Sequence, residues 1–488
     1  MREEIFRMER VTYLDRDIVY LEDFNLQIFK GEIMGMLTVN AHGLSAMLAL
    51  IQGNLPLYDG YIYLGGKQVN SWKFSDKGQN RISIIGVQSR LVDDLSVMDN
   101  IFVLRQGFRQ TLIRYKMLRK QLLPFLEEME IHISADNRVS TLSVFERVLV
   151  ELLRAIVLEH KLIVLNDISM SISEAELEKL HRILLVYADR GFSFLYICPH
   201  FEEISKICDR AAILSNGRIQ SIISGENMEK EIPRLYSEDY LSMVKDYRMQ
   251  ERSVEKPVKK MSVSLLNGAG NCILDFSVKT GECLAIRMTE NDSFQMLHNC
   301  LMEEKRSNWK LYIDGQPGSV LKDKRIAVVR EYATKSMIFP ELDFLDNLCM
   351  CLSRRMPDIW AKKKILENIK TECAEVFEEN VFDKPANEWS EMQKYWLIYN
   401  RALLQKPELV ICIQPFMGAD RIHRIYIWKM IEQLLEQKIA VVILSLNLSD
   451  SLALADRLMI INGEGGGKEF ARENFDAIPG DVPWKNIS

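Results

Sequence analysis

The sequence predicts an α/β protein whose two similar halves each fold around a mainly parallel sheet covered by helices. Short apolar segments alternate with helical patterns along both halves, as is typical of parallel strands buried on both faces. Landmarks of the first half return in the second at a nearly constant spacing. In the first half, residues 31–53 have the layout of a strand, a polar turn and a helix.

The repeat spans the whole chain and divides it into domains. Three dipeptides recur at a spacing of 250, 247 and 247 residues, namely Gly31-Glu32 as Gly281-Glu282, Arg154-Ala155 as Arg401-Ala402, and Asp209-Arg210 as Asp456-Arg457. Because three landmarks hold one offset, we expect a duplicated domain. The predicted boundaries are 1–240 for the first domain, 241–260 for a charged linker, and 261–488 for the second domain.

Each half repeats one order of elements. A small antiparallel β region comes first, the turn and its helix follow, and three strands then alternate with helices, the first of these strands leading into a helical subdomain. The segments expected in the first half are 6–29 (β hairpin), 81–87 (strand), 99–131 (helical), 162–167 (strand) and 192–198 (strand). Those expected in the second half are 261–278, 325–330, 345–379, 409–413 and 440–446.

Composition, net charge and cysteine spacing indicate which classes of protein and ligand are expected. Of the 488 residues, 48% are hydrophobic and 27% charged, which is ordinary for a globular protein with ample core. The net charge of -6 gives no general attraction to nucleic acid or anionic membranes. The nine cysteines lack metal-ligand spacing and are expected to be buried free thiols. Because the sequence shows neither a signal peptide nor an apolar run of about 18 residues, we expect a cytoplasmic protein that reaches membranes through partners.

The turn between strand and helix in the first half has the layout of a phosphate-binding loop. The pattern G-x-x-x-x-G-K-[ST] would begin at Thr38 and end at Ser45. Gly43 and Ser45 fit this pattern, whereas Thr38 replaces the first glycine and Leu44 replaces the lysine. The frame of a nucleotide site is therefore present without its central charge, and a packed turn with no ligand is the competing interpretation.

The chain resembles the ATP-binding subunits of bacterial ABC importers for monosaccharides of the ribose and galactose type, which carry two cassettes in one chain. The matching motifs of the first half are Gly31-Glu32, residues 99–102, Leu142-Ser143 and residues 202–209. Those of the second half are Glu331, Lys406-Pro407, Pro415, Gly418 and Asp420. The resemblance covers essentially the whole chain and identifies it as a degenerate member of this family with two P-loop NTPase cassettes.

The resemblance implies ATP and Mg²⁺ as cofactors, held between the P-loop of one cassette and the LSGGQ signature of the other. In the first cassette it assigns nucleotide contacts to Asn40, Gly43, Leu44, Ser45 and Ser143, and metal contacts to Ser45 and Asn166. Asn166 stands at the Walker B aspartate, and Asp167 stands at the catalytic glutamate. Leu44 cannot neutralise phosphate charge, and Phe145 at a signature glycine should block the approach of the backbone to the γ-phosphate.

Three further candidates of the first cassette keep open alternatives. His200 and Gln88 would act as the switch histidine and the Q-loop glutamine, but ungapped counting places Pro199 and Val87 in those registers. A slip of one residue near a strand end turns the side chain to the other face. Tyr13 stands where the family stacks an aromatic ring on adenine, and a core position in the hairpin is an equal alternative.

The second cassette departs further from the family pattern. Its loop register, residues 287–295, contains no glycine, and Phe294 occupies the lysine position. Ile413 replaces the Walker B aspartate, while Gln414 at the catalytic position could orient a water molecule. The resemblance assigns nucleotide contacts to Ser390 of the signature and to Asp420 of the D-loop. The acidic Glu290 and Asp292 in this loop would repel phosphate.

These observations predict a component of a carbohydrate ABC importer that hydrolyses little or no ATP. The resemblance implies permease subunits and a sugar-binding protein system as partners, no nucleic acid, and a cytoplasmic location on the inner face of the cell membrane. Two alternatives stay open. The chain could be a working ATPase with unusual site residues that energises sugar import, or a soluble regulatory or scaffold protein without a transporter partner.

Overall fold

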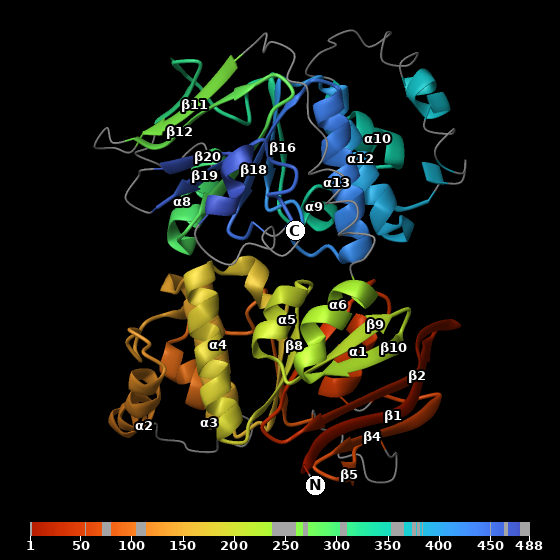
Figure 1. Ribbon diagram of the computed structural model, residues 1–488, viewed down its shortest axis with the longest axis vertical. Coiled ribbons are helices and arrows are strands. Elements are labelled where there is room, and N and C mark those ends of the chain that lie inside the picture. The colour runs from red at the N-terminus through yellow and green to blue at the C-terminus, as the bar shows by residue number, and fades with distance from the viewer. Residues whose placement is uncertain are drawn as a thin grey trace. The chain divides into compact units, whose positions relative to one another are not determined.

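A computed structural model shows two compact units, Met1–Leu241 (unit 1) and Ser242–Ser488 (unit 2) (Figure 1). The structure describes residues 2–53, 55–70, 80–103, 114–236, 260–266, 272–302, 310–352, 366–372, 377, 381–382, 384–448, 450–462 and 467–478. All but the last residue of the predicted linker 241–260 lie outside these ranges.

Unit 1 is built on a six-stranded sheet with the strand order β10-β9-β3-β8-β7-β6. Strands β9, β3, β8, β7 and β6 run parallel to their neighbours, and β10 runs antiparallel to β9. The strands are β3 (Ile33–Thr38), β6 (Ile82–Gly86), β7 (Leu162–Asn166), β8 (Ser193–Ile197), β9 (Arg210–Ser215) and β10 (Arg218–Ser224). Ile33 and Leu37 of β3 pack in the core on one face of the sheet, and Met34 and Met36 pack in the core on the other face. Because successive side chains of a strand point to opposite faces and both faces are buried here, the whole segment is apolar.

A second, antiparallel sheet covers one of these two cores. Its strand order is β2-β1-β4-β5, and it packs with α1 over Met34 and Met36. The strands are β1 (Glu4–Asp15), β2 (Ile18–Phe29), β4 (Asp59–Leu64) and β5 (Lys67–Gln68). Figure 1 shows these strands as a layer of their own at the N-terminal end of unit 1.

Helices cover the opposite face and form the helical subdomain of unit 1. Residues of α2, α3, α4 and α5 share one core with Ile33 and Leu37. The helices are α1 (Leu44–Gln52), α2 (Tyr115–Glu128), α3 (Val144–Val157), α4 (Glu174–Asp189), α5 (Phe201–Ile207) and α6 (Met228–Tyr236), with a π-helical segment at Asp99–Val103 and short 3-10 turns at Val139–Thr141, Ile168–Ser171 and Gly225–Asn227. Both α3 and α4 begin with a capping box, formed by Ser143 with Glu146 and by Ser173 with Glu176.

Unit 2 repeats this architecture. Its central sheet has the order β16-β17-β18-β13-β19-β20, and its antiparallel sheet has the order β12-β11-β14-β15. The strands are β11 (Lys260–Leu266), β12 (Cys272–Lys279), β13 (Cys283–Met288), β14 (Lys310–Ile313), β15 (Gln316–Pro317), β16 (Ile326–Val329), β17 (Leu409–Ile413), β18 (Ala440–Ser445), β19 (Arg457–Ile461) and β20 (Gly467–Ala471). The helices are α8 (Asn291–Met302), α9 (Ala333–Ser336), α10 (Phe344–Cys349), α12 (Glu391–Leu404) and α13 (Arg421–Glu436), with 3-10 turns at Ala386–Glu388 and Arg472–Ala477. The strand order of each sheet corresponds position by position between the units.

The predicted fold class is confirmed. Both units combine a mostly parallel sheet with helices, a small antiparallel sheet and a helical region, as expected for two cassette-like α/β domains. The predicted strands 162–167 and 409–413 correspond to β7 and β17. Within the described part of the chain, every helix is too short or too polar to span a bilayer.

Candidate functional site

The candidate residues of unit 1 follow strands whose carboxyl ends lie at one edge of the central sheet. Strands β6, β7, β8 and β3 are neighbours and run in the same direction. The segments that follow them carry the loop 39–43, Gln88, Asp167 and His200. Ligands of open α/β sheets bind at this kind of edge, so the topology brings the candidates to the place where a nucleotide would be expected.

The loop 39–43 between β3 and α1 is held by hydrogen bonds to other parts of unit 1. Asn40 Nδ2 donates a hydrogen bond to Asn216 Oδ1 at 2.7 Å, and the Asn216 amide donates to Asn40 Oδ1 at 3.1 Å. His42 Nε2 lies 2.8 Å from the carbonyl oxygen of Val19, and its ring stacks on Tyr20. These contacts tie the loop to β2 and to the turn between β9 and β10.

Gly43 is required by the backbone at this point. Its φ of 84° lies in the left-handed region, and a Cβ there would lie 2.5 Å from the carbonyl oxygen of Tyr20. The glycine that the sequence assigned to phosphate contact therefore also permits close packing of the loop against β2. Its presence alone does not identify a nucleotide site.

Leu44 and Ser45 are the first two residues of helix α1, and their side chains differ in burial. Leu44 is half-buried and packs against the core beneath the antiparallel sheet, whereas Ser45 is exposed. An apolar side chain packed in this way offers no charge to a phosphate. Ser45 keeps a hydroxyl at the helix start, where a Mg²⁺ ligand would be needed.

Asn166 is the last residue of β7, and Asp167 follows it. Asp167 adopts a left-handed conformation with φ of 57°, and its amide donates a hydrogen bond of 2.9 Å to the carbonyl oxygen of Ile197. This bond joins the ends of β7 and β8 and fixes the turn that follows. Asn166 is half-buried and brings no charge to the metal position.

The other candidates of unit 1 occupy different surroundings. His200 is buried at the start of α5, with Nε2 3.2 Å from the sulfur of Met170. Gln88 is exposed, and its segment is held by Glu151, whose carboxylate accepts hydrogen bonds from the Ser89 hydroxyl and the Arg90 amide. Tyr13 is half-buried in β1 against the core beneath the antiparallel sheet.

The signature serines are helix caps in both units. The Ser143 hydroxyl accepts a hydrogen bond from the Glu146 amide at 3.2 Å, and the Ser390 hydroxyl accepts one from the Gln393 amide at 3.2 Å. Phe145 is buried in the core of unit 1 that contains α3 and α4. Phe145 therefore has a packing role at a position where the family needs glycine.

In unit 2 the loop itself is missing. Two residues, Thr289 and Glu290, connect β13 to α8, whereas five residues connect β3 to α1 in unit 1. Phe294 lies on the first turns of α8 with 1% of its surface exposed, and Ile413 at the end of β17 is fully buried. Both side chains belong to one hydrophobic core. The residues present here do not fit a phosphate group or a metal ion.

Gln414 and Asp420 also have structural roles. Gln414 takes the same left-handed conformation as Asp167, with φ of 42°, and its amide donates a hydrogen bond to the Leu444 carbonyl at 2.8 Å. Asp420 caps α13 by accepting a hydrogen bond from the His423 amide at 2.9 Å. No cluster of three or more histidine, cysteine or acidic side chains suited to a metal ion occurs in the ranges that the structure describes.

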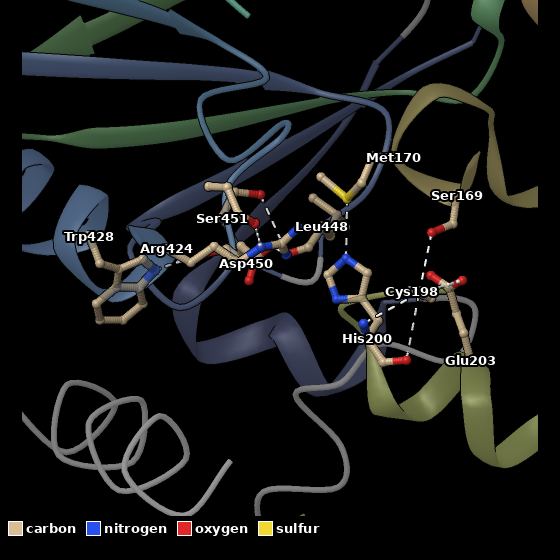
Figure 2. Close-up of polar contacts among 11 residues, drawn as sticks. Ser169, Met170, Cys198, His200, Glu203, Arg424, Trp428, Leu448, Asp450 and Ser451 are labelled. Carbon is tan, nitrogen blue, oxygen red and sulfur yellow. Dashed lines mark hydrogen bonds and ion pairs between the residues drawn. The ribbon is translucent and has the colours of Figure 1, made fainter. Parts of the chain in front are cut away.

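Sequence reasoning did not single out Glu203 in unit 1 or Asp450 in unit 2, and both of these acidic residues are buried (Figure 2). In unit 1, Glu203 of α5 accepts hydrogen bonds from the Tyr196 hydroxyl at 3.0 Å and the Cys198 thiol at 3.1 Å. In unit 2, Asp450 pairs with Arg424 and accepts a hydrogen bond from the Trp428 indole through its carbonyl oxygen at 2.8 Å. The sequence signal that could have identified these two acids as equivalent positions is the repeat spacing of 247 residues, which separates Glu203 from Asp450.

The chain was compared with known proteins. Residues 21–169 match the family "ABC transporter". The chain is 24% identical over 485 residues to the xylose import ATP-binding proteins XylG of Shigella flexneri and of Escherichia coli strain K12, covering 94% of this chain and 93% of each relative.

Solved structures give matches of about half the chain. An ATP-binding cassette of an ABC transporter in its ADP conformation is 18% identical, with a TM-score of 0.42, covering 51% of this chain and 99% of that chain. The protein cbiO1 from Clostridium perfringens, part of the ABC transporter complex cbiONQ, is 18% identical, with a TM-score of 0.41, covering 50% of this chain and 99% of that chain.

Proposed function

We propose that this chain is an ATP-binding-subunit-like component of a carbohydrate ABC importer, and that it binds Mg-ATP weakly or not at all and hydrolyses little or none. Its relatives over 94% of the chain are xylose import ATP-binding proteins, which supports a role in sugar import. In this role it associates with permease subunits, and through them with a sugar-binding protein, on the inner face of the cell membrane.

The observation that carries the loss of hydrolysis is the burial of Phe294 and Ile413. Both stand at positions where the ATPases of this family carry charge, and both fill the hydrophobic core of unit 2. A phosphate could reach this place only if the side chains left the core, and burying a phosphate beside apolar groups would carry a large desolvation cost. Exposed Glu290 and Asp292 add repulsion.

Unit 1 keeps part of a nucleotide site. The five-residue connection, Gly43 and exposed Ser45 retain the layout of the loop, although Leu44 supplies no cation. Any nucleotide that binds this chain should therefore bind unit 1. Hydrolysis there would still lack the phosphate-binding lysine, whose preorganised charge is typically worth several kcal/mol in a transition state.

Phosphate release from Mg-ATP by the purified full-length chain tests the proposal. We expect no release above the level of the Asp167→Ala variant. Turnover in the range usual for enzymes, about 1–10³ s⁻¹, that disappears in Asp167→Ala would refute the loss of hydrolysis and favour a working ATPase.

Two matched substitutions assign any bound nucleotide to a unit. Ser45 and Gln295 follow the two lysine positions, and both side chains are exposed, so glutamate at either place adds charge without disturbing a core. We expect Ser45→Glu to weaken binding of a fluorescent ATP analogue and Gln295→Glu to leave it unchanged. The opposite pattern would place the site in unit 2 and contradict the assignment.

Recovery of partners from membranes tests the transporter role. We expect permease subunits to co-purify with the tagged full-length chain both with and without Mg-ATP. Recovery that requires Mg-ATP would favour the working ATPase, and recovery of no transporter subunit under either condition would favour a soluble regulatory or scaffold protein.

A further inference from the structure

Glu203 is a buried acid, and its counterpart in unit 2 has a different kind of hydrogen-bond and charge partner. Counterparts lie 247 residues apart, so Asp450 corresponds to Glu203, Arg424 to Leu177, and Trp428 to His181. Asp450 has a buried arginine partner from α13. The position of that arginine in unit 1 is held by Leu177, which is buried and uncharged.

The partners of Glu203 are neutral donors instead of a cation. Its Oε2 atom accepts from the Tyr196 hydroxyl and the Cys198 thiol, and no arginine, lysine or histidine of the described residues forms an ion pair with it. The Tyr196 hydroxyl in turn lies 3.2 Å from His181 Nε2. A carboxylate buried to 8% exposure without a cation is costly, because it has lost water and gained no opposite charge.

The titratable and polar groups around Glu203 come from every element packed against it. They are Asp167 and Ser169 in the turn after β7, Tyr196 of β8, Cys198 and His200 between β8 and α5, His181 of α4, Lys206 of α5, and Cys208 after α5. Burial lowers the pKa of His181 to about 4, so this ring stays neutral near pH 7. The surroundings therefore offer Glu203 a second acid, Asp167, and no compensating buried charge.

We propose that Glu203 is a proton-binding site of unit 1, which holds a proton in the folded protein at pH values where an exposed glutamate is ionised, whereas the equivalent carboxyl of unit 2 is paired with Arg424. Burial is the largest cause that raises the pKa of Glu203 to about 7, and the charge of Asp167 raises it further, while hydrogen bonds from Cys198, Tyr196 and Ser169 act in the opposite direction. The proposal does not depend on nucleotide binding or on a transporter partner.

Loss of this proton affects the edge of the sheet that carries the candidate site. The Cys198 sulfur accepts a hydrogen bond from the His200 amide at 3.3 Å and lies 3.5 Å from the Ser169 hydroxyl (Figure 2). An ionised Glu203 would repel Asp167 and reorder the donors around Cys198. The protonation state is therefore linked to the turns that hold Asp167 and His200.

The direction of the pH dependence follows from linkage. The pKa of a glutamate in an unfolded chain is about 4.3, and burial raises the pKa of Glu203 in folded unit 1 to about 7. The folded state therefore holds more protons between these values, so the stabilisation is complete below about pH 4.3 and is lost as pH rises through about 7. The unfolding equilibrium constant of unit 1 should increase by up to about tenfold per pH unit within this window.

Infrared spectroscopy of the full-length chain tests the site directly. We expect a protonated carboxylic acid C=O band that disappears with a midpoint near pH 7 in the wild type and in Glu202→Gln, and that is absent in Glu203→Gln. Glu202 is the control because it is the neighbouring acid on α5 and its side chain is only half-buried. A wild-type band that disappears entirely below pH 5 would overturn the proposal without reliance on any variant.

Hydrogen exchange provides the second measurement. Peptides of β8 and α5 are followed by mass spectrometry from pH 5 to 8, with correction for the intrinsic exchange rate. We expect protection to fall as pH rises in the wild type and in Glu202→Gln, and to stay nearly constant in Glu203→Gln, because glutamine imitates the neutral acid. Equal slopes in all three proteins would contradict the proposed linkage.

Discussion

A lysine placed at position 294 or at position 44 should change the stability of the two units to very different extents. Phe294 is 1% exposed and packs within the core of unit 2, whereas Leu44 is half-buried at the start of α1. A buried phenylalanine removes about 150–250 Å² from water, which at about 25 cal/mol per Å² gives an upper limit of about 4–6 kcal/mol. Truncation of such residues to alanine costs about 3–5 kcal/mol.

Phe294→Lys should therefore destabilise unit 2 by at least about 3–5 kcal/mol, because it removes the ring and places an ammonium group in an apolar core. Leu44→Lys should change the stability of unit 1 by about 1 kcal/mol or less, since a lysine stem can cover apolar surface while its charge reaches water. Gln295→Lys adds the same charge at an exposed neighbouring position and serves as the control.

Tryptophan fluorescence during urea unfolding reports on unit 2, because six of the seven tryptophans lie beyond residue 241. Hydrogen exchange of α1 reports on unit 1. If Phe294→Lys unfolds at the same urea concentration as the wild type and Gln295→Lys, the side chain can leave the core at little cost. In that case Phe294 would not prevent a phosphate from reaching this place in unit 2.

Three further substitutions test the structural roles of candidate residues. Ser143→Ala and Ser390→Ala should each destabilise their units by about 1 kcal/mol through loss of a helix cap, and a thermal melt unchanged by either would contradict the capping role. Asp450→Asn should destabilise unit 2 by about 3–5 kcal/mol, because it leaves Arg424 buried without its partner; tryptophan fluorescence measures this, and a neutral result would show that the pair is not buried in solution. Gly43→Ala should cost about 1–3 kcal/mol because of its left-handed conformation and the close Tyr20 carbonyl, whereas unchanged hydrogen exchange in α1 would show that the loop adapts.

The fold could be predicted because its signals are local. Continuous apolar segments such as β7 and β17 are too short for helices and are bounded by polar residues, so their extents could be assigned to within a residue or two. The spacing of the repeats added an independent check, since each strand of unit 1 has a counterpart in unit 2. Neither signal depends on contacts between distant residues.

The contacts of the candidate site could not be predicted in the same way. Asn40 is hydrogen-bonded to Asn216, a residue 176 positions away in the sequence. The sequence near either residue contains no pattern that predicts this contact. Helix α8 starts at Asn291, and Phe294 near its start packs into a core formed by several strands. Sequence comparison could name the lysine position, but only the packing shows that the position has become part of the interior.

The left-handed turns that follow β7 and β17 show whether the backbone conformation at Asp167 can be explained by the fold alone. Asp167 and Gln414 both have positive φ, at 57° and 42°, and each amide donates to the carbonyl oxygen that ends the next strand. Unit 2 has this turn although the buried apolar residue Ile413 precedes it and Phe294 is buried near the start of α8. The turn is therefore present in a unit where buried apolar side chains occupy both of these positions. The hydrogen bond between neighbouring strand ends is sufficient to explain its retention, so the similar placement of Asp167 in unit 1 is evidence for the shared fold and does not by itself argue for catalysis.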